Sequence, residues 1–315
     1  MVILDGYTEN PGDLSWDAFK AFGELTVYDR TAPEDVVSRL EGVEIALTNK
    51  TLITKEILDR CPDLEYIGVL ATGYNVVDTE DCRRRGITVT NIPNYSTASV
   101  AQMTFALLLE ICQQVGKHNA SVKSGDWAKC PDFCYTLTPL MELDGKTMGI
   151  CGYGRIGHAV ARLAKAFGMR VLVSSGHPDW NDRNVDGYVS REDMFRQADV
   201  ISLHCPLKDD TKGMINKGSI AQMKDGMILL NTGRGPLVVE ADVAEALKNG
   251  KLKAYGCDVV SVEPIQADNP LLSCENAYMT PHIAWAAKEC RERLMEIAVK
   301  NVKAFTEGCP QNKVN

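Results

Sequence analysis

The sequence predicts an α/β fold with two Rossmann-like, doubly wound parallel-sheet domains and an interdomain cleft. Three observations favour this fold. The chain has 315 residues, about twice the length of an ordinary domain. Short apolar runs of strand length alternate with helical patterns along most of the chain. A strand, a glycine-rich turn and a helix follow one another near the middle of the chain.

The first alternating series occupies the amino-terminal third of the chain. Its strand-like runs are VILD, LTVYD, EIALTN, YIGVLA and ITVTN, and its helical patterns begin near Ser15, Pro33, Lys55 and Asp78. From Ser96 to about His118, apolar residues recur at helical spacing without interruption. This run predicts one long helix that leaves the first domain.

A second alternating series follows the long helical run. Its strand-like runs are KTMGICG, RVLVSS, DVISLHC, MILLNTG, AYGCDVV and AYMTPH. Helices are expected through Phe167, from Arg191, through Leu247, and finally from near Lys288 to near Glu307. Two such series predict two similar lobes, and the cleft between lobes of this kind is a favoured place for ligands.

Composition and charge exclude several classes of partner. The formal net charge is −8, and no Lys/Arg run is dense enough to neutralise a phosphate backbone, so we expect no nucleic acid partner. No window approaches the ~18 apolar residues that span a membrane, and the start MVILDGYTEN lacks the features of a signal peptide. We therefore expect a cytoplasmic protein without a membrane partner.

The eleven cysteines are scattered through apolar runs, as expected of reduced thiols inside a core. Cys130 with Cys134, and His204 with Cys205, are the only hints of metal ligands. Neither pair has a second pair of ligands at a usable spacing, so no metal is expected.

The strongest local motif is a glycine-rich turn with three glycines, Gly152, Gly154 and Gly157. It follows the strand TMGIC directly and opens the helix RIGHAVARLAKAF. In this context the pattern GxGxxG is typical of dinucleotide binding. The first glycine permits the tight turn, the second lets the backbone approach a pyrophosphate, and the third allows close packing of helix and strand. The amides of Arg155 and Ile156 at the start of the helix would face the phosphates.

The strand after this helix bears on the choice of dinucleotide. An NAD-preferring fold normally ends this strand with an acid that binds the ribose hydroxyls. Here the position is Ser175, which neither supplies a carboxylate nor repels a 2′-phosphate. An arginine clamp for a 2′-phosphate is also missing, since only His177 and the more distant Arg183 follow. NAD is the expected cofactor, and NADP stays open.

Three ionisable residues follow three different strands of the second series. Arg234 lies in NTGRG, Glu263 in CDVVSVEP and His282 in TPHIAW. Open α/β sheets bind ligands at the carboxyl ends of their parallel strands, so these side chains can converge. The set can hold a carboxylate with a guanidinium, move a proton with an imidazole, and orient that imidazole with a carboxylate.

At these residues the sequence resembles the D-isomer-specific 2-hydroxyacid dehydrogenase family, and especially its glycerate dehydrogenase or hydroxypyruvate reductase branch. The motifs ATGYNVVD, SVAQMTFALLLE, PDFCYTLTPL, GICGYGRIG, LHCPL, NTGRG, CDVVSVEP and PHIAW occur in the order of the family. The resemblance implies a substrate-binding domain, residues 1–98 plus 283–315, and an NAD(P)-binding Rossmann domain, residues 99–282. It also implies that the segment near Phe133 to Tyr135 reaches a partner subunit, and hence a homodimer.

The resemblance also implies roles for individual residues. Arg234 would bind the substrate carboxylate, His282 would be the acid/base and Glu263 would support it. Backbone amides of the loop Ala71-Thr72-Gly73 would share that carboxylate, so Thr72 and Gly73 are substrate-binding candidates. The positions expected to line the cofactor outside the glycine-rich turn are Thr97, Ser175, Cys205, Pro206, Thr232, Gly233, Asp258, which would face the nicotinamide carboxamide, and Ala284. Gln102 stands where many members have glutamate, a departure that concerns packing more than chemistry.

The expected reaction is hydride transfer between NAD(P)H and C2 of a small 2-oxo or 2-hydroxy acid. Hydroxypyruvate and D-glycerate are the expected substrate pair, because PDFCYTLTPL and PHIAW match that branch best, and glyoxylate is the second candidate. The alternative from another class is a nucleotide-sensing, corepressor-like binding protein on the same fold. Turnover of NADH or NADPH with hydroxypyruvate distinguishes the two.

Overall fold

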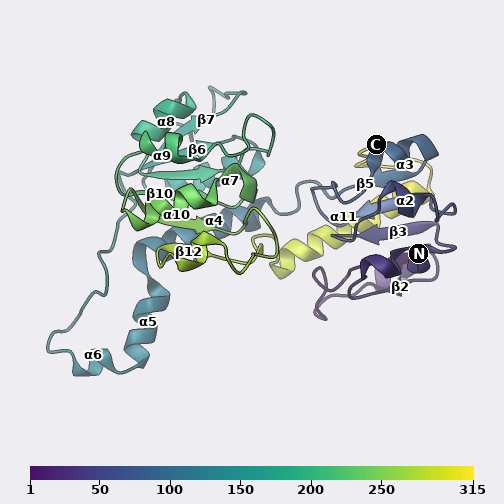
Figure 1. Ribbon diagram of the computed structural model, residues 1–315, viewed down its shortest axis with the longest axis horizontal. Helices are drawn as coiled ribbons and strands as arrows, with labels where there is room; N and C mark the ends of the chain where they lie inside the picture. The colour runs from purple at the N-terminus through teal and green to yellow at the C-terminus, as the bar shows by residue number, and fades with distance from the viewer. The chain divides into compact units, whose positions relative to one another are not determined.

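The computed structural model describes residues 1–315, and the chain forms two compact units. The first unit comprises Met1–Ser96 and Trp285–Asn315, and the second comprises Thr97–Ala284. Each unit is built around a parallel sheet (Figure 1). The predicted α/β fold with two parallel-sheet domains is therefore confirmed.

The first unit has a five-stranded sheet in the order β2-β1-β3-β4-β5. Its strands are β1 (Val2–Ile3), β2 (Thr26–Val27), β3 (Ile45–Thr48), β4 (Tyr66–Val69) and β5 (Thr88–Thr90). Its helices are η1 (Asp17–Phe22), η2 (Pro33–Asp35), α1 (Val36–Leu40), α2 (Lys55–Leu58), α3 (Thr79–Arg85) and α11 (Lys288–Thr306). The segment predicted as a helix from about Ser15 is thus only the short 3-10 helix η1.

The second unit has a seven-stranded sheet in the order β12-β11-β10-β9-β6-β7-β8. The strands are β6 (Thr147–Cys151), β7 (Arg170–Ser174), β8 (Gly187–Tyr188), β9 (Val200–Leu203), β10 (Met227–Asn231), β11 (Leu252–Cys257) and β12 (Ala277–Met279). The strands β6, β9 and β10 are buried along their whole length, which explains why they read as continuous apolar runs. The order of the strands reverses between β6 and β9, where sheets of this kind bind ligands.

The helices of the second unit cover its sheet or extend from it. They are α4 (Thr97–Gln113), α5 (Val115–Lys123), α6 (Asp126–Lys129), α7 (Arg155–Ala166), α8 (Arg191–Gln197), α9 (Lys217–Ala221), η3 (Gly235–Leu237), α10 (Glu240–Lys248) and η4 (Pro270–Ser273). Figure 1 shows α5 and α6 extending away from the sheet of this unit.

The prediction of one uninterrupted helix from Ser96 to about His118 is wrong. The helix α4 ends at Gln113, and Gln114 has a left-handed backbone with φ of 47°. The side chain of Gln114 donates to the hydroxyl of Tyr278 at 2.6 Å, which fixes this residue against the sheet. The chain therefore changes direction here and starts α5, which buries none of its residues.

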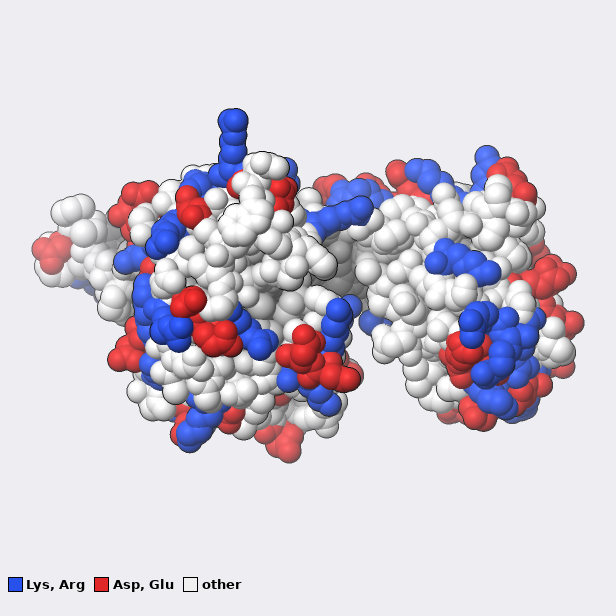
Figure 2. Space-filling view, turned by 90° about the horizontal axis from the view of Figure 1, so that it is seen from above, with Lys and Arg blue, Asp and Glu red and all other residues white.

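Charged side chains of both signs lie close together on the face of the molecule in Figure 2. Many of them pair, as on α3, where Arg84 and Arg85 contact Asp81 at 2.8 and 2.6 Å. None of the helices combines the length and the apolar character that crossing a membrane would require.

One buried carboxyl of the first unit predicts a dependence of stability on pH. Glu9 is fully buried, and the Thr8 hydroxyl lies 3.1 Å from both of its carboxyl oxygens. Burial, and then the negative charge of Asp5, raise the pKa of Glu9 from 4.5 to about 8. Between these two values the unfolded chain has released the proton while the folded protein keeps it. The free energy of unfolding should therefore fall by about 1.4 kcal/mol for each pH unit in that window.

We expect Glu9→Gln to remove this decline, because the amide stays neutral at every pH. At pH 8 the variant should unfold with a free energy about 3–5 kcal/mol above that of the wild-type protein, and at pH 4.5 the two should agree. Urea unfolding at a series of pH values measures the difference. Glu41→Gln, at an exposed position of the same unit, is the matched control and should follow the wild type. Parallel curves for Glu9→Gln and the wild type would contradict the prediction.

Candidate active site

The glycine-rich turn lies between β6 and α7, and two of its glycines are required by their surroundings. Gly152 has φ of 92°, and a Cβ built on it would lie 2.4 Å from the backbone nitrogen of Cys205. A Cβ on Gly157 would lie 2.4 Å from the carbonyl oxygen of Gly152. By contrast, no heavy atom beyond the adjoining residues lies within 4 Å of a Cβ built on Gly154. The turn is therefore tightly packed on the inside and open where a ligand can approach the backbone at the start of α7.

Ser175 follows β7, next to the strand that leads into the turn. Cys151 of β6 pairs with Ser174 of β7, and the amide of Gly152 donates to the Ser174 carbonyl at 2.9 Å. The hydroxyl of Ser175 accepts a hydrogen bond from the amide of His177 at 3.2 Å. The position where an acid was expected is therefore beside the glycine-rich turn and carries a neutral side chain.

The loop NTGRG begins at Asn231, the last residue of β10. Hydrogen bonds hold it, both within the loop and to α4. The side chain of Asn231 donates to the carbonyl of Arg234 at 2.9 Å, and the hydroxyls of Thr232 and Thr104 lie 2.9 Å apart. A Cβ on Gly235 would lie 2.0 Å from the carbonyl carbon of Val260, so this part of the loop fits closely against the next one. The Arg234 side chain is exposed.

The loop that carries His282 is anchored by the buried carboxylate of Asp258. This carboxylate accepts hydrogen bonds from the Thr280 hydroxyl at 2.6 Å and from the amides of Ile283 and Ala284, both at 2.8 Å. Between these anchors His282 adopts a left-handed backbone with φ of 53°. Asp258 thus fixes a conformation that a residue with a side chain rarely adopts.

His282 and Glu263 are in direct contact. The Nδ1 atom of His282 lies 2.7 Å from Oε2 of Glu263, and the other carboxylate oxygen accepts from the amide of Val260 at 3.2 Å. Both side chains are about one-third exposed. The imidazole is therefore oriented through one nitrogen, and its other nitrogen, Nε2, is the one that can exchange a proton with a ligand.

The predicted residues of the second unit gather at one edge of its sheet. All strands of this sheet run parallel, so the segments after their last residues lie along the same edge. These segments contain the glycine-rich turn, Ser175, Cys205, Pro206, Thr232, Gly233, Arg234, Asp258, Glu263, His282 and Ala284. Thr97 is the first residue of α4. Thr72 and Gly73 belong to the first unit, where the Thr72 hydroxyl donates to the carbonyl of Ile92 at 2.9 Å.

A comparison with known protein families identifies the family to which this chain belongs. The family model described as D-isomer specific 2-hydroxyacid dehydrogenase, NAD binding domain, matches residues 105–284. The chain belongs to the D-isomer specific 2-hydroxyacid dehydrogenase family. It is therefore a dehydrogenase, and its residues 105–284 match the dinucleotide-binding part of that family.

Relatives of this dehydrogenase match it along nearly the whole chain. A hydroxypyruvate reductase from Blautia hydrogenotrophica is 52% identical, covering 100% of this chain and 99% of the relative. A glycerate dehydrogenase from Methylorubrum extorquens is 42% identical over 92% of each chain. The structure of D-lactate dehydrogenase from Aquifex aeolicus, complexed with NAD and lactic acid, superposes with a TM-score of 0.84 at 31% identity, covering 98% of this chain and 96% of that one.

One set of contacts beside the glycine-rich turn was not predicted from the sequence. The carboxylate of Asp182, in the loop after β7, accepts from the Tyr153 hydroxyl at 2.6 Å and contacts Nδ1 of His158 at 2.9 Å. Partial burial raises the pKa of Asp182, but hydrogen bonds, above all those from Tyr153 and Asn184, outweigh it and lower the pKa to about 2. The loop is thereby tied to the glycine-rich turn. No sequence motif connects Tyr153 with an aspartate 29 residues later.

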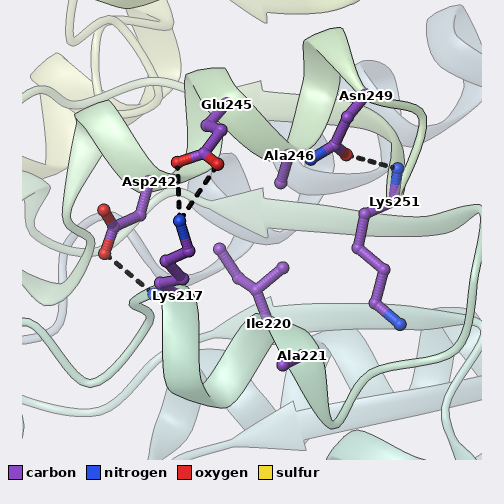
Figure 3. A pocket seen from close by; sticks show the side chains of 8 residues that line it. All are labelled: Lys217, Ile220, Ala221, Asp242, Glu245, Ala246, Asn249 and Lys251. Atoms are coloured by element: carbon purple, nitrogen blue, oxygen red, sulfur yellow. Dashed lines mark hydrogen bonds and ion pairs between the residues drawn. The ribbon is translucent and has the colours of Figure 1, made fainter.

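The dehydrogenase also has a surface pocket of about 360 Å³ between α9 and α10 (Figure 3). Its charged groups are paired with protein groups. The ammonium of Lys217 lies 3.1 and 3.3 Å from the oxygens of Glu245, and its amide donates to Asp242 (Figure 3). Lys251 contacts Asp225 at 2.8 Å. Because these charges already have partners, we do not assign a substrate site to this pocket.

Proposed function

We propose that this dehydrogenase reduces hydroxypyruvate to D-glycerate, with NADH or NADPH as hydride donor. The observation that carries the proposal is the 2.7 Å contact between His282 and Glu263, on loops that follow the neighbouring strands β12 and β11. The identity of the substrate is supported by the 52% identical hydroxypyruvate reductase. Glyoxylate is the second candidate, because it presents the same carboxylate and carbonyl.

The glycine-rich turn fits a dinucleotide. Gly154 leaves space at the start of α7, where backbone amides have no partner in the first turn of the helix and attract phosphate oxygens. When bound, the reduced nicotinamide ring supplies the hydride. Cys205, Pro206, Thr232, Gly233, Asp258, Ala284 and Thr97 are the further residues proposed to line the cofactor.

The chain's own residues position the substrate and move the proton. The guanidinium of Arg234 binds the substrate carboxylate through two parallel hydrogen bonds. The imidazolium of His282 gives its proton to the carbonyl oxygen at C2 as negative charge develops there. Glu263 orients the ring through Nδ1 and balances its positive charge. The substrate-binding role of Thr72 and Gly73 remains a prediction from the sequence.

Steady-state assays with purified protein test the proposal. NADH and NADPH oxidation should be followed with hydroxypyruvate, glyoxylate and pyruvate, and kcat/KM should be highest for hydroxypyruvate. A higher value for glyoxylate or pyruvate would overturn the substrate assignment. Dinucleotide binding without turnover of any of these acids would favour the nucleotide-sensing alternative, which family membership does not favour.

The neutral side chain at position 175 predicts weak discrimination between the two dinucleotides. In the wild-type protein, kcat/KM for NADH and NADPH should agree within ~1–2 kcal/mol, because no carboxylate binds the ribose diol or repels a 2′-phosphate. Ser175→Asp should raise the preference for NADH by about tenfold or more, since the new charge lies against the 2′-phosphate. The specificity constants of both proteins for both cofactors measure this change.

Ser175→Asn is the matched control, because asparagine has the shape of aspartate without its charge. Its preference should stay close to that of the wild type. An unchanged preference in Ser175→Asp would mean that position 175 does not lie beside the ribose.

We also propose that the dehydrogenase is a homodimer, joined through the arm of residues 115–140 that contains α5 and α6. Large apolar side chains of this arm are exposed, with Trp127 at 51% and Phe133 at 89%. Exposed apolar surface of this kind is typical of an interface. Phe133→Asp should shift the protein toward the monomer in sedimentation velocity, whereas Leu52→Asp, at an exposed apolar residue of the first unit, should not. A wild-type monomer would contradict the proposal.

A further inference from the structure

Two cysteines lie together where the strand order of the second sheet reverses. Cys151 is the last residue of β6, and its register partner in β9 is Leu203. Cys205 follows the end of β9 by two residues and packs against the core cluster that contains Cys151, Leu203 and Met214, so its side chain lies on the same side of the sheet as Cys151. The amide of His204, the residue before Cys205, donates to the carbonyl of Cys151 at 2.7 Å. The fold thus brings the thiol at the end of β6 and the thiol in the segment after β9 to one side of the sheet.

The two thiols interact directly and differ in character. Contact between the two thiols lowers the pKa of Cys205, and the same contact, together with burial, raises the pKa of Cys151. The Cys205 thiol also donates to the thioether sulfur of Met214 at 3.6 Å. Cys151 is 6% exposed, whereas Cys205 is partly exposed. Cys205 is therefore the more acidic and more accessible thiol of the pair, and Cys151 is a buried thiol beside it.

The backbone of Cys205 also forms the inner wall of the glycine-rich turn. A Cβ at Gly152 would meet the nitrogen of Cys205 at 2.4 Å and its Cα at 2.6 Å, so the two segments have no room between them. A disulfide bond of about 2.0 Å is much shorter than the contact between two hydrogen-bonded sulfurs. Joining the sulfurs would pull Cys205 toward Cys151 and force the turn to shift.

We propose that Cys205 is a redox modification site, at which a hydroperoxide produces a Cys151–Cys205 disulfide that obstructs dinucleotide binding. The obstruction rests on the proposed role of the Gly152–Gly157 turn, whereas formation of the disulfide does not. The Cys205 thiolate attacks the peroxide O–O bond, which gives a sulfenic acid and releases hydroxide or an alcohol. The Cys151 sulfur then attacks the Cys205 sulfur, and the hydroxyl group leaves as water. With hydrogen peroxide, two thiols and one peroxide give one disulfide and two waters.

Mass spectrometry of the full-length protein tests the disulfide directly. Trypsin releases the two cysteines on separate peptides, residues 147–155 and residues 197–208, each with a single cysteine. After hydrogen peroxide treatment and alkylation of the remaining thiols, we expect these peptides to be linked, and dithiothreitol to separate them. Bound NADH should slow the linkage. If peroxide oxidises other cysteines and leaves this pair unlinked, the proposal is wrong.

Variants separate the roles of the two thiols. In Cys151→Ser no disulfide forms, so Cys205 should advance to sulfinic acid, which dithiothreitol does not reduce. In Cys309→Ser, which removes an exposed cysteine, linkage should proceed as in the wild type. Recovery of unmodified Cys205 from peroxide-treated Cys151→Ser would contradict its assignment as the reactive thiol.

NADH titration followed by fluorescence tests the obstruction. The oxidised wild-type protein should bind NADH at least about tenfold more weakly than the reduced protein, and dithiothreitol should restore the affinity. Equal affinities of the linked and reduced proteins would overturn the obstruction. A reduced protein that does not bind NADH would instead refute the proposed function, while the linked peptide could still be detected.

Discussion

His282→Ala is expected to lower kcat for hydroxypyruvate by about 10²–10⁴, the range attributed to general acid catalysis. The affinity for NADH should change little. The imidazole is held by Glu263 on the loop after β12, whereas the dinucleotide turn is formed by residues after β6. Steady-state kinetics with hydroxypyruvate and a fluorescence titration with NADH measure the two quantities separately. A variant that keeps kcat within about threefold of wild type would refute the acid/base role.

Glu263→Gln provides a second test of the same pair. Glutamine keeps the size of the side chain but removes the negative charge that balances the imidazolium. The rate of hydroxypyruvate reduction should therefore decline at a lower pH than in the wild type, because reduction needs the protonated ring. An unchanged pH profile would mean that the 2.7 Å contact does not control the proton.

The alternation of strands and helices could be predicted because the central strands β6, β9 and β10 are buried along their whole length and form continuous apolar runs. The end of α4 could not be predicted in this way. Its break at Gln114 depends on a hydrogen bond to Tyr278, 164 residues further along the chain. The local sequence contains no sign of that contact, and glutamine is not a residue that favours a left-handed backbone.

The placement of the site residues could also be predicted from the sequence, whereas the conformation of the His282 loop could not. The positions of Arg234, Glu263 and His282 after separate strands were sufficient to expect them at one edge of the sheet. The conformation of the His282 loop was not predictable, since it depends on the Asp258 carboxylate binding Thr280, Ile283 and Ala284. Aspartate after a strand has many roles, and only the folded chain shows that the Asp258 carboxylate anchors this loop.

Arg234→Lys should lower kcat/KM for hydroxypyruvate by about 100-fold or more, although the positive charge is kept. Lysine cannot form the two parallel hydrogen bonds that a planar guanidinium makes with a carboxylate. The loop cannot readily compensate, because the Arg234 carbonyl is bonded to Asn231 and Gly235 lies against the Val260 backbone. The dinucleotide affinity should be unaffected.

A substrate without a carboxylate identifies the cause of this loss. Glycolaldehyde has the carbonyl and hydroxyl of hydroxypyruvate but lacks the carboxylate, so its slow reduction should be nearly the same in Arg234→Lys and in the wild type. Arg196→Lys, at an exposed arginine of α8 that pairs with Asp193, is the matched control and should retain wild-type kinetics with both substrates. If KM and kcat for hydroxypyruvate both stay within about threefold in Arg234→Lys, a difference under ~1 kcal/mol, Arg234 does not bind the substrate carboxylate. An equal loss with both substrates would instead show that the arginine acts on the carbonyl or on the loop.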